Sequence, residues 1–269
     1  LTLDESIEIT KVYSVAGLLN GGDSIINRRP FRSPHHTISL HAMSGGGRDP
    51  RPGEISLAHG GVLFLDELPE FNRNVLEVMR QPLEEGVVNI SRLNGMYRFP
   101  ADFLLVAARN PCPCGQYPDM NKCTCTVNQI RNYNARISKP LLDRIDINVE
   151  VRKVKYNELF DDAAGASSEE LREQVQRAQK AQLERYKNDG IRFNSQMDSR
   201  LCEKYIPLGR DEKEFMKYCF SELSMTARGG YRLLKIARTI ADIDGDDEVR
   251  TSHLQEAAFF RNSDEGGAI

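Results

Sequence analysis

The chain has 269 residues, of which 40% are hydrophobic and 28% charged, so it is long enough to bury one large or two modest cores. No stretch reaches the roughly 18 apolar residues of a membrane helix, and the acidic N-terminus does not resemble a signal peptide, so we expect a cytoplasmic protein without membrane contact. The formal net charge of -3 excludes a surface that is basic throughout and leaves only local patches for nucleic acid.

Short apolar runs broken by glycine and proline fill the first half of the chain, which is typical of an α/β domain with buried strands. Residues 62–65 form an unbroken apolar run that ends in Asp66 and Glu67, which predicts a central strand. A helix should begin after Asn72, a candidate N-cap. Residues 103–108 predict a second buried strand. These elements favour a parallel sheet with helices between its strands.

Three further segments complete the predicted layout. Residues 87–99 predict a β-hairpin, because an Asn-Gly pair between two strand-like runs is a strong turn signal. Alternating apolar and polar residues over 145–151 predict a third strand of the sheet. The Asp, Ala, Gly and Ser residues of 157–168 have no apolar periodicity and indicate a linker. Residues 169–269, after the linker, are expected to be helical.

The helices of the C-terminal part have recognisable start signals. Ser167 and Glu170 have the spacing of a capping box. Asp198 is a candidate N-cap of the next helix, and Thr251 or Ser252 can open the last one. Several separate helices are therefore predicted here.

The acidic pair at the end of the central strand indicates nucleotide chemistry. P-loop NTPases use such a strand end to place a magnesium-binding carboxylate at the sheet edge. In that interpretation Asp66 holds Mg²⁺ through water, and Glu67 activates the water that attacks the γ-phosphate of ATP. Asn110, after the next strand, could reach the same phosphate or water. The alternatives are an acidic first helical turn for the pair and a turn residue before Pro111 for Asn110.

Two arginines are candidates for contact with the nucleotide. Arg144 lies just before the third predicted strand, and an arginine supplied across a subunit boundary stabilises the charge that develops in phosphoryl transfer. Arg228 lies at the start of a predicted helix and could reach the nucleotide from the helical domain. The alternatives are a surface ion pair of Arg144 with Asp143 or Asp146, and a solvated first-turn position for Arg228.

Four of the six cysteines form a cluster in the loop 112–125, with the spacing C-x-C-x8-C-x-C. Four thiolates close together suit a structural zinc ion, although the one-residue spacing is tighter than that of most zinc pairs. Reduced free thiols are the alternative. His35, His36 and His41 lie in a loop region beside arginines and are interpreted as phosphate or backbone partners, so no metal is assigned to them. The candidate zinc ligands are Cys112, Cys114, Cys123 and Cys125.

Four longer segments make the sequence more specific than any single motif. They are 29–37 (RPFRSPHHT), 52–61 (PGEISLAHGG), 110–115 (NPCPCG) and 138–144 (SKPLLDR). Together they resemble the magnesium-chelatase-like family of the ComM/YifB type, which is a group of AAA+ ATPases. The likeness covers nearly the whole chain.

The resemblance implies a fold and a set of site residues. The fold is an α/β AAA+ core over 1–156, a P-loop-type parallel sheet sandwiched by helices and incomplete at its N-terminus. An all-helical C-terminal lid domain over 169–269 follows the linker. The family's functional positions fall on Asp66 and Glu67 as the Walker B pair, Asn110 as sensor 1, Arg144 as the arginine finger and Arg228 as sensor 2, with Arg232 as a second candidate for sensor 2.

The sequence departs from the family pattern in one respect. It contains no G-x-x-x-x-G-K-[ST] phosphate-binding loop, and the glycines at 21 and 22 are not followed by the required lysine. The family places this loop upstream of Leu1, so the chain is expected to be a fragment. Such a fragment should turn over little or no ATP by itself.

The hairpin at 87–99 resembles those that related helicase motors point into a central pore. Arginines near such a pore would contact a phosphate backbone without regard to sequence. The alternative is that they are solvated loop residues or intersubunit ion pairs. The candidate DNA-binding residues are Arg92, Arg28, Arg29, Arg32, Arg48 and Arg51.

The resemblance favours one function and leaves two alternatives. The favoured function is an ATP-driven ring, a homo-oligomer expected to be a hexamer, that moves on or remodels DNA by helicase or branch-migration activity. Its cofactors would be ATP and Mg²⁺, with zinc as a possible third. The first alternative is the ATPase subunit of a magnesium-porphyrin chelatase. The second is a zinc-stapled DNA-binding or assembly module without catalytic activity.

Overall fold

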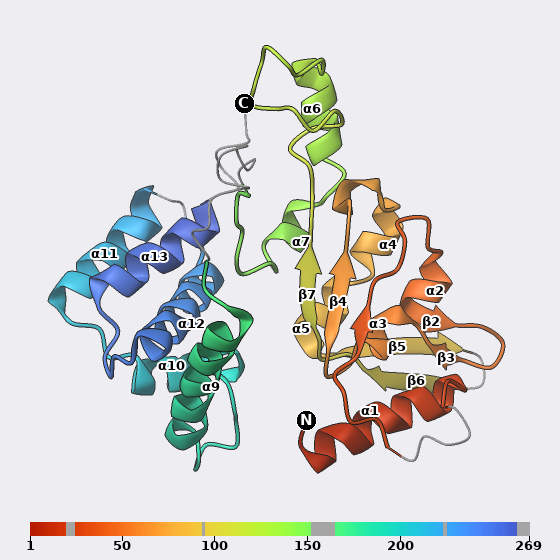
Figure 1. Cartoon of the computed structure of the whole chain (residues 1–269), viewed down its shortest axis with the longest axis horizontal. Coiled ribbons are helices and arrows are strands. Elements are labelled where there is room, and N and C mark those ends of the chain that lie inside the picture. Colours follow the sequence, from red (N-terminus) through yellow and green to blue (C-terminus); the bar gives the residue numbers. More distant parts are fainter. Residues whose placement is uncertain (20–24, 93–94, 152–164, 223–224, 263–269) are drawn as a thin grey trace. The chain divides into compact units, whose positions relative to one another are not determined.

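A computed structural model describes residues 1–19, 25–92, 95–151, 165–222 and 225–262 (Figure 1). These residues form two compact units that divide between Ile145 and Asp146. Most of the predicted linker at 157–168 and the tip of the predicted hairpin lie outside the described residues, so both stay predictions.

A three-stranded parallel sheet lies at the centre of the first unit (Figure 1). Its strands are β1 (Phe31–Arg32), β4 (Val62–Leu65) and β7 (Leu104–Ala107), in the order β1-β4-β7. The predicted central strand is confirmed as β4, which pairs with β1 on one side and with β7 on the other. Leu63 and Leu65 of β4 are fully buried, as expected for the middle strand of a sheet.

Short helices surround this sheet, and their start signals are those in the sequence. Asn72 accepts a hydrogen bond from the backbone N–H of Asn74 and caps α4, as predicted. Pro82 lies in the first turn of α5, where a proline is tolerated because it removes an N–H that has no partner there. The helices of the first unit are α1 (Leu3–Ala16), α2 (Leu40–Ser44), α3 (Glu54–Leu57), the 3-10 turn η1 (Leu68–Glu70), α4 (Arg73–Glu77), α5 (Arg80–Glu85), α6 (Val127–Asn134) and α7 (Lys139–Leu142).

Two antiparallel ribbons complete the unit. The predicted hairpin is formed by β5 (Val87–Arg92) and β6 (Gly95–Pro100), with Arg92 opposite Gly95 at its outer end. A smaller ribbon pairs β2 (Gly45–Gly46) with β3 (Arg51–Pro52). The hydrophobic core joins the hairpin to the sheet and the helices, and it includes Met43, Ile55, Leu63, Leu65, Leu68, Leu76, Met79, Val88, Ile90, Ile137 and Leu141.

The third strand predicted at 145–151 is wrong. This segment has no regular secondary structure, and Ile147, Val149 and Val151 are 52%, 66% and 88% exposed. Alternation predicts a strand only where a neighbouring strand offers its hydrogen-bonding edge, and the segment pairs with no described strand. The third member of the sheet is instead β1, whose two residues are too few to give a periodic signal.

All the regular secondary structure described in the second unit is helical, as predicted. Ser167 and Glu170 form the expected capping box, and the Asp198 carboxylate accepts from the Leu201 N–H. A core of apolar side chains from α10, α11, α12 and α13, joined by Tyr186 just after α9 and Met197 just after η2, holds the unit together. The helices are α9 (Ser168–Arg185), the 3-10 turn η2 (Asn194–Gln196), α10 (Ser199–Tyr205), α11 (Arg210–Glu222), α12 (Ala227–Asp244) and α13 (Thr251–Asn262).

A buried polar network fixes the helices of this unit to one another. The Asp242 carboxylate is fully buried and pairs with the guanidinium groups of Arg238 and Arg185. Asn194 donates from its side-chain amide to the same carboxylate over 2.8 Å. A buried charge is tolerated only where such partners satisfy it. Among the described residues, no helix is both long enough and apolar enough to cross a membrane.

Candidate functional site

The ends of β4 and β7 bring the acidic pair and the segment of Asn110 to one edge of the sheet. The Ala108 N–H donates to the Leu65 carbonyl, and the Leu68 N–H donates to the Ala108 carbonyl, both over 2.9 Å. These two bonds hold the chain after β7 against the chain that carries Asp66 and Glu67. Carboxyl ends of adjacent parallel strands are where ligands bind in open α/β sheets.

The backbone at Glu67 adopts an unusual conformation. Its φ of 52° and ψ of 48° place it in the left-handed region, and it is the one non-glycine residue with positive φ in the described part of the chain. Its N–H donates to the Asp66 carboxylate over 2.9 Å. Such strain costs about 1 kcal/mol or more and is found at functional sites where the surroundings enforce it. Both acidic side chains are exposed and accessible to a ligand.

His36 contacts the acidic pair, and sequence reasoning did not predict this contact. Its Nδ1 lies 3.4 Å from a carboxylate oxygen of Glu67. The imidazole ring packs edge-on against Phe71, with the ring centres 6.4 Å apart. The only sequence signal was the position of His36 in the segment 29–37, which gives no indication of a partner further along the chain.

The C-terminal end of α6 and the residues just after it contact the turn that follows the acidic pair. Arg136 forms an ion pair with Glu70 over 2.8 Å and donates to the Pro69 carbonyl over 3.2 Å. Tyr133 is buried beside them, and burial, followed by the nearby charges of Glu70 and Glu67, raises the pKa of its hydroxyl. The pattern of the sequence did not indicate this role for α6.

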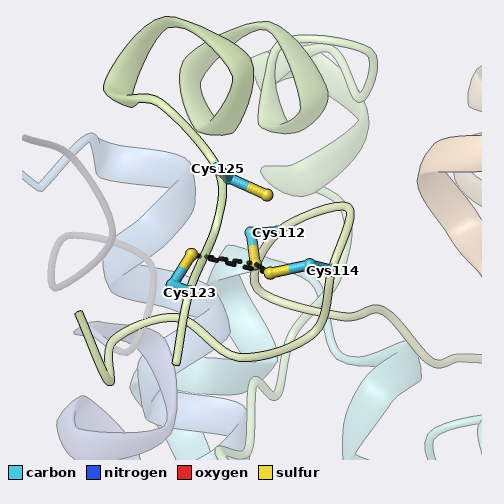
Figure 2. A group of neighbouring side chains, drawn as sticks. All are labelled: Cys112, Cys114, Cys123 and Cys125. Atoms are coloured by element: carbon cyan, nitrogen blue, oxygen red, sulfur yellow. Dashed lines mark hydrogen bonds between the residues drawn. The ribbon is translucent and has the colours of Figure 1, made fainter. Parts of the chain in front are cut away.

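The loop between β7 and α6 brings the four predicted metal ligands together. Figure 2 shows the side chains of Cys112, Cys114, Cys123 and Cys125 gathered in this loop, and one sulfur atom from each lies within 4.8 Å of the others. All four are free thiols rather than disulfides. Backbone N–H groups of Gln116 and then Thr124 lower the pKa of the Cys114 thiol to about 6. The cluster could therefore hold a metal ion.

The arginines predicted to meet the nucleotide lie in different units. Arg144 belongs to the first unit, where its guanidinium pairs with Glu84 and donates to the Pro140 carbonyl, and its side chain is 11% exposed. Arg228 and Arg232 belong to α12 in the second unit. Arg232 pairs there with Asp146 over 3.0 Å, and Arg228 is exposed in the first turn. The roles assigned to them stay predictions.

The arginines predicted to contact DNA fall into two groups. Arg29 and Arg32 make contacts within the first unit, Arg29 with the Gly60 carbonyl and Glu5, and Arg32 with both oxygens of Glu54 over 2.6 Å. The others are exposed, and none of them forms an ion pair with a described residue. This second group is Arg28, Arg48, Arg51 and Arg92.

The exposed end of the hairpin meets the smaller ribbon. The Arg92 Nε donates to the Gly47 carbonyl over 3.3 Å. Residues 47–50 connect β2 to β3, so this bond places Arg92 beside the loop that carries Arg48 and precedes Arg51. Three exposed cations therefore share one local surface.

This architecture defines a class of protein. A parallel sheet whose buried central strand ends in an acidic pair, beside a strand followed by asparagine, belongs to the P-loop type, and the helical second unit adds the lid of an AAA+ protein. The family model described as magnesium chelatase, subunit ChlI, matches residues 1–159, and the model of the ChlI C-terminal region matches residues 165–261. The chain therefore belongs to the magnesium-chelatase-like AAA+ family and is of the ComM/YifB type.

Individual relatives agree with this family. The chain is 41% identical over 268 residues to YifB of Salmonella typhimurium and 41% identical over 258 residues to the competence protein ComM of Haemophilus influenzae. These matches cover 98% and 95% of the chain but only 51% and 50% of the relatives, so the chain spans about half their length. The magnesium-chelatase subunit ChlI of Porphyra purpurea is 23% identical over 223 residues, 82% of the chain and 55% of that relative.

Proposed function

We propose that this chain carries the hydrolytic residues of an AAA+ ATPase. The observation that carries the proposal is the meeting of Asp66, Glu67 and the Asn110 segment at the carboxyl edge of β4 and β7. Asp66 holds the Mg²⁺ of MgATP, because an exposed carboxylate at this edge offers the oxygen ligands that this ion prefers. Glu67 orients and deprotonates the attacking water, and Asn110 contacts that water or the γ-phosphate.

The neighbours of Glu67 support its role as a base. A base must be held in position to be effective, and the left-handed backbone at Glu67 together with the His36 contact restricts its carboxylate. The phosphate-binding loop is not among these 269 residues, so the nucleotide pocket needs more than this chain provides. Hydrolysis is therefore assayed in the full-length protein.

The arginines complete the proposal. Arg144 serves a nucleotide bound to a neighbouring copy in a ring, expected to be hexameric, and its pairing with Glu84 keeps it shielded until that nucleotide arrives. Arg228, or Arg232 in its place, contacts the nucleotide from the helical unit. Ring assembly and these contacts follow from the family resemblance.

DNA is the proposed substrate of the motor. Arg48, Arg51 and Arg92 form the exposed basic surface at the outer end of the hairpin, and arginines bind phosphate without sequence preference. Arg28 is exposed as well, whereas the internal contacts of Arg29 and Arg32 give less support to a DNA role for them.

A magnesium-chelatase subunit is the second candidate. The family description and the Porphyra relative favour it, although that relative is 23% identical whereas the ComM and YifB relatives are 41% identical. A chelatase subunit would be stimulated by its partner subunits and a porphyrin, and DNA would have no effect. The remaining alternative is a non-catalytic module stabilised by zinc, which would bind DNA or metal and would not hydrolyse ATP.

The test measures ATP hydrolysis by the full-length protein with and without DNA. A DNA motor is stimulated by DNA, and the double variant Arg48→Ala/Arg92→Ala loses most of the stimulation while retaining hydrolysis without DNA. Arg172→Ala on α9 is the matched control, because it removes an exposed arginine far along the chain from the hairpin. Hydrolysis that DNA does not change, or stimulation that survives in the double variant, contradicts the DNA role.

A further inference from the structure

Three sulfur atoms of the cysteine cluster have the spacing of ligands to one ion, and the Cys125 sulfur lies within 4.8 Å of each of them. The distances are 3.4 Å between Cys112 and Cys114, 3.8 Å between Cys112 and Cys123, and 3.6 Å between Cys114 and Cys123. A tetrahedral zinc ion with bonds of about 2.3 Å holds its sulfur ligands about 3.8 Å apart. A disulfide brings two sulfur atoms to about 2.0 Å, so these distances fit a shared metal and not a covalent pair.

The loop that carries the cluster has almost no hydrophobic core. Among residues 111–129, Cys112 alone is buried, and the other side chains are partly or fully exposed. A segment of this length without buried apolar groups lacks the interactions that offset its conformational entropy. Metal binding supplies that free energy in small metal-dependent folds.

Both ends of this loop are attached to the candidate hydrolytic site. At its start, Cys112 follows Asn110 by two residues, and a side-chain carbon placed on Gly115 would lie 3.9 Å from the Asn110 carboxamide. The turn of the first two cysteines, closed by a hydrogen bond from the Gly115 N–H to the Cys112 carbonyl, thus folds back beside Asn110.

At the other end, Cys125 immediately precedes Thr126, whose side chain caps α6. This helix returns to the turn after Glu67 through Tyr133 and the Arg136–Glu70 ion pair. An ion bound by Cys112, Cys114, Cys123 and Cys125 would therefore connect the Asn110 side of the site to the Glu67 side.

We propose that the four cysteines bind one zinc ion and that this ion fixes the position of Asn110 relative to the acidic pair. The cysteines are positioning residues in this account, because they are proposed to bind the ion and not the substrate. Zinc binding and local order depend only on the loop. The consequence for hydrolysis rests on the proposed function.

The metal is tested first, by elemental analysis of the full-length protein purified without added metal. One zinc per chain is expected, and the double variant Cys112→Ser/Cys123→Ser should lose it. Cys202→Ala, which removes a buried thiol of the second unit, is the control and should keep it. Cobalt substitution should give the ligand-field bands of a tetrahedral tetrathiolate site. Absence of stoichiometric metal, or iron in place of zinc, overturns the proposal.

The positioning role is tested by hydrogen exchange before and after zinc removal with a chelator. Amides of residues 108–115 and of α6 should exchange at least about tenfold faster after removal, and those of α12 should not change. Return of zinc should restore protection, which separates loss of the ion from irreversible misfolding. Faster exchange confined to 113–125, with 108–112 and α6 unchanged, overturns the connection to Asn110.

The consequence for hydrolysis is read as a split between kcat and KM. Zinc removal should lower kcat of the full-length protein at least about tenfold and leave KM for ATP within about twofold, because Asn110 acts on the reacting water rather than on substrate affinity. A fall in both parameters, or in neither, overturns the positioning role. Failure of the proposed function would give a different result. Hydrolysis would be absent even with zinc bound, whereas the metal content and the hydrogen-exchange results would be as predicted.

Discussion

The Nδ1 atom of His36 lies 3.4 Å from the Glu67 carboxylate, so the segment that follows β1 supplies a partner for the proposed base, which follows β4. We expect His36→Ala to lower kcat for ATP hydrolysis by about 10-fold to 100-fold, because the carboxylate loses a group that orients it. KM should change little. Steady-state kinetics of the full-length protein check this, with His41→Ala as the control. Unchanged kcat in His36→Ala would show that the contact is incidental.

Arg144 and Glu84 should be energetically coupled, since the guanidinium is 11% exposed and pairs with this carboxylate. A double-mutant cycle of Arg144→Ala and Glu84→Ala should give a coupling of about 1–3 kcal/mol in the free energy of unfolding, measured by urea denaturation. A coupling below about 0.3 kcal/mol would contradict the pair. In the hydrolysis assay, Arg144→Ala should be more damaging than Glu84→Ala, because only the arginine is proposed to reach a neighbouring nucleotide.

Gly61 should tolerate no side chain. A Cβ there would lie 2.0 Å from the Pro30 carbonyl oxygen, which accepts a hydrogen bond from the Val62 N–H where β1 and β4 begin to pair. Gly61→Ala should therefore destabilise the first unit by about 3 kcal/mol or more, because the strands must separate to make room. Thermal denaturation checks this, with Gly165→Ala as a control at a glycine that has open space around it. Equal melting temperatures of the two variants would contradict the close strand contact.

Asp242 should be essential for the second unit. It is the shared acceptor for Arg238, Arg185 and Asn194, and its removal leaves two guanidinium groups without their buried counter-charge. We expect Asp242→Ala to cost about 3–5 kcal/mol in the free energy of unfolding. Glu203→Ala, an exposed acid on α10, should cost less than about 0.5 kcal/mol. Denaturation followed by circular dichroism compares them, and similar stabilities would contradict the network.

The sequence correctly predicted those elements and helix caps that depend on residues close together in the chain. The apolar run of β4, the Asn72 cap and the Ser167–Glu170 capping box depend on residues a few positions apart, and all three are present in the structure. The strand predicted at 145–151 is absent from the structure, because a strand also needs a neighbouring strand to pair with, which its own sequence cannot reveal.

The candidate site was predictable in part. The pattern predicted that the segments carrying Asp66, Glu67 and Asn110 meet, because the ends of adjacent parallel strands share one sheet edge, and the roles of these residues stay predictions. The His36–Glu67 and Arg144–Glu84 contacts join residues far apart in sequence, and only the tertiary fold brings them together. The cysteine spacing likewise predicted a metal site but not its attachment to Asn110 and α6.

The role proposed for Glu67, just after β4, is activation of the water that hydrolyses ATP. Its most direct test compares ATP binding and hydrolysis by the full-length protein and its Glu67→Gln variant, with Glu85→Gln as the matched control. We predict that Glu67→Gln binds ATP with unchanged affinity and loses hydrolysis by about 100-fold or more, because the amide cannot accept the proton of the attacking water. Hydrolysis by Glu67→Gln at the rate of the unsubstituted protein would contradict the account.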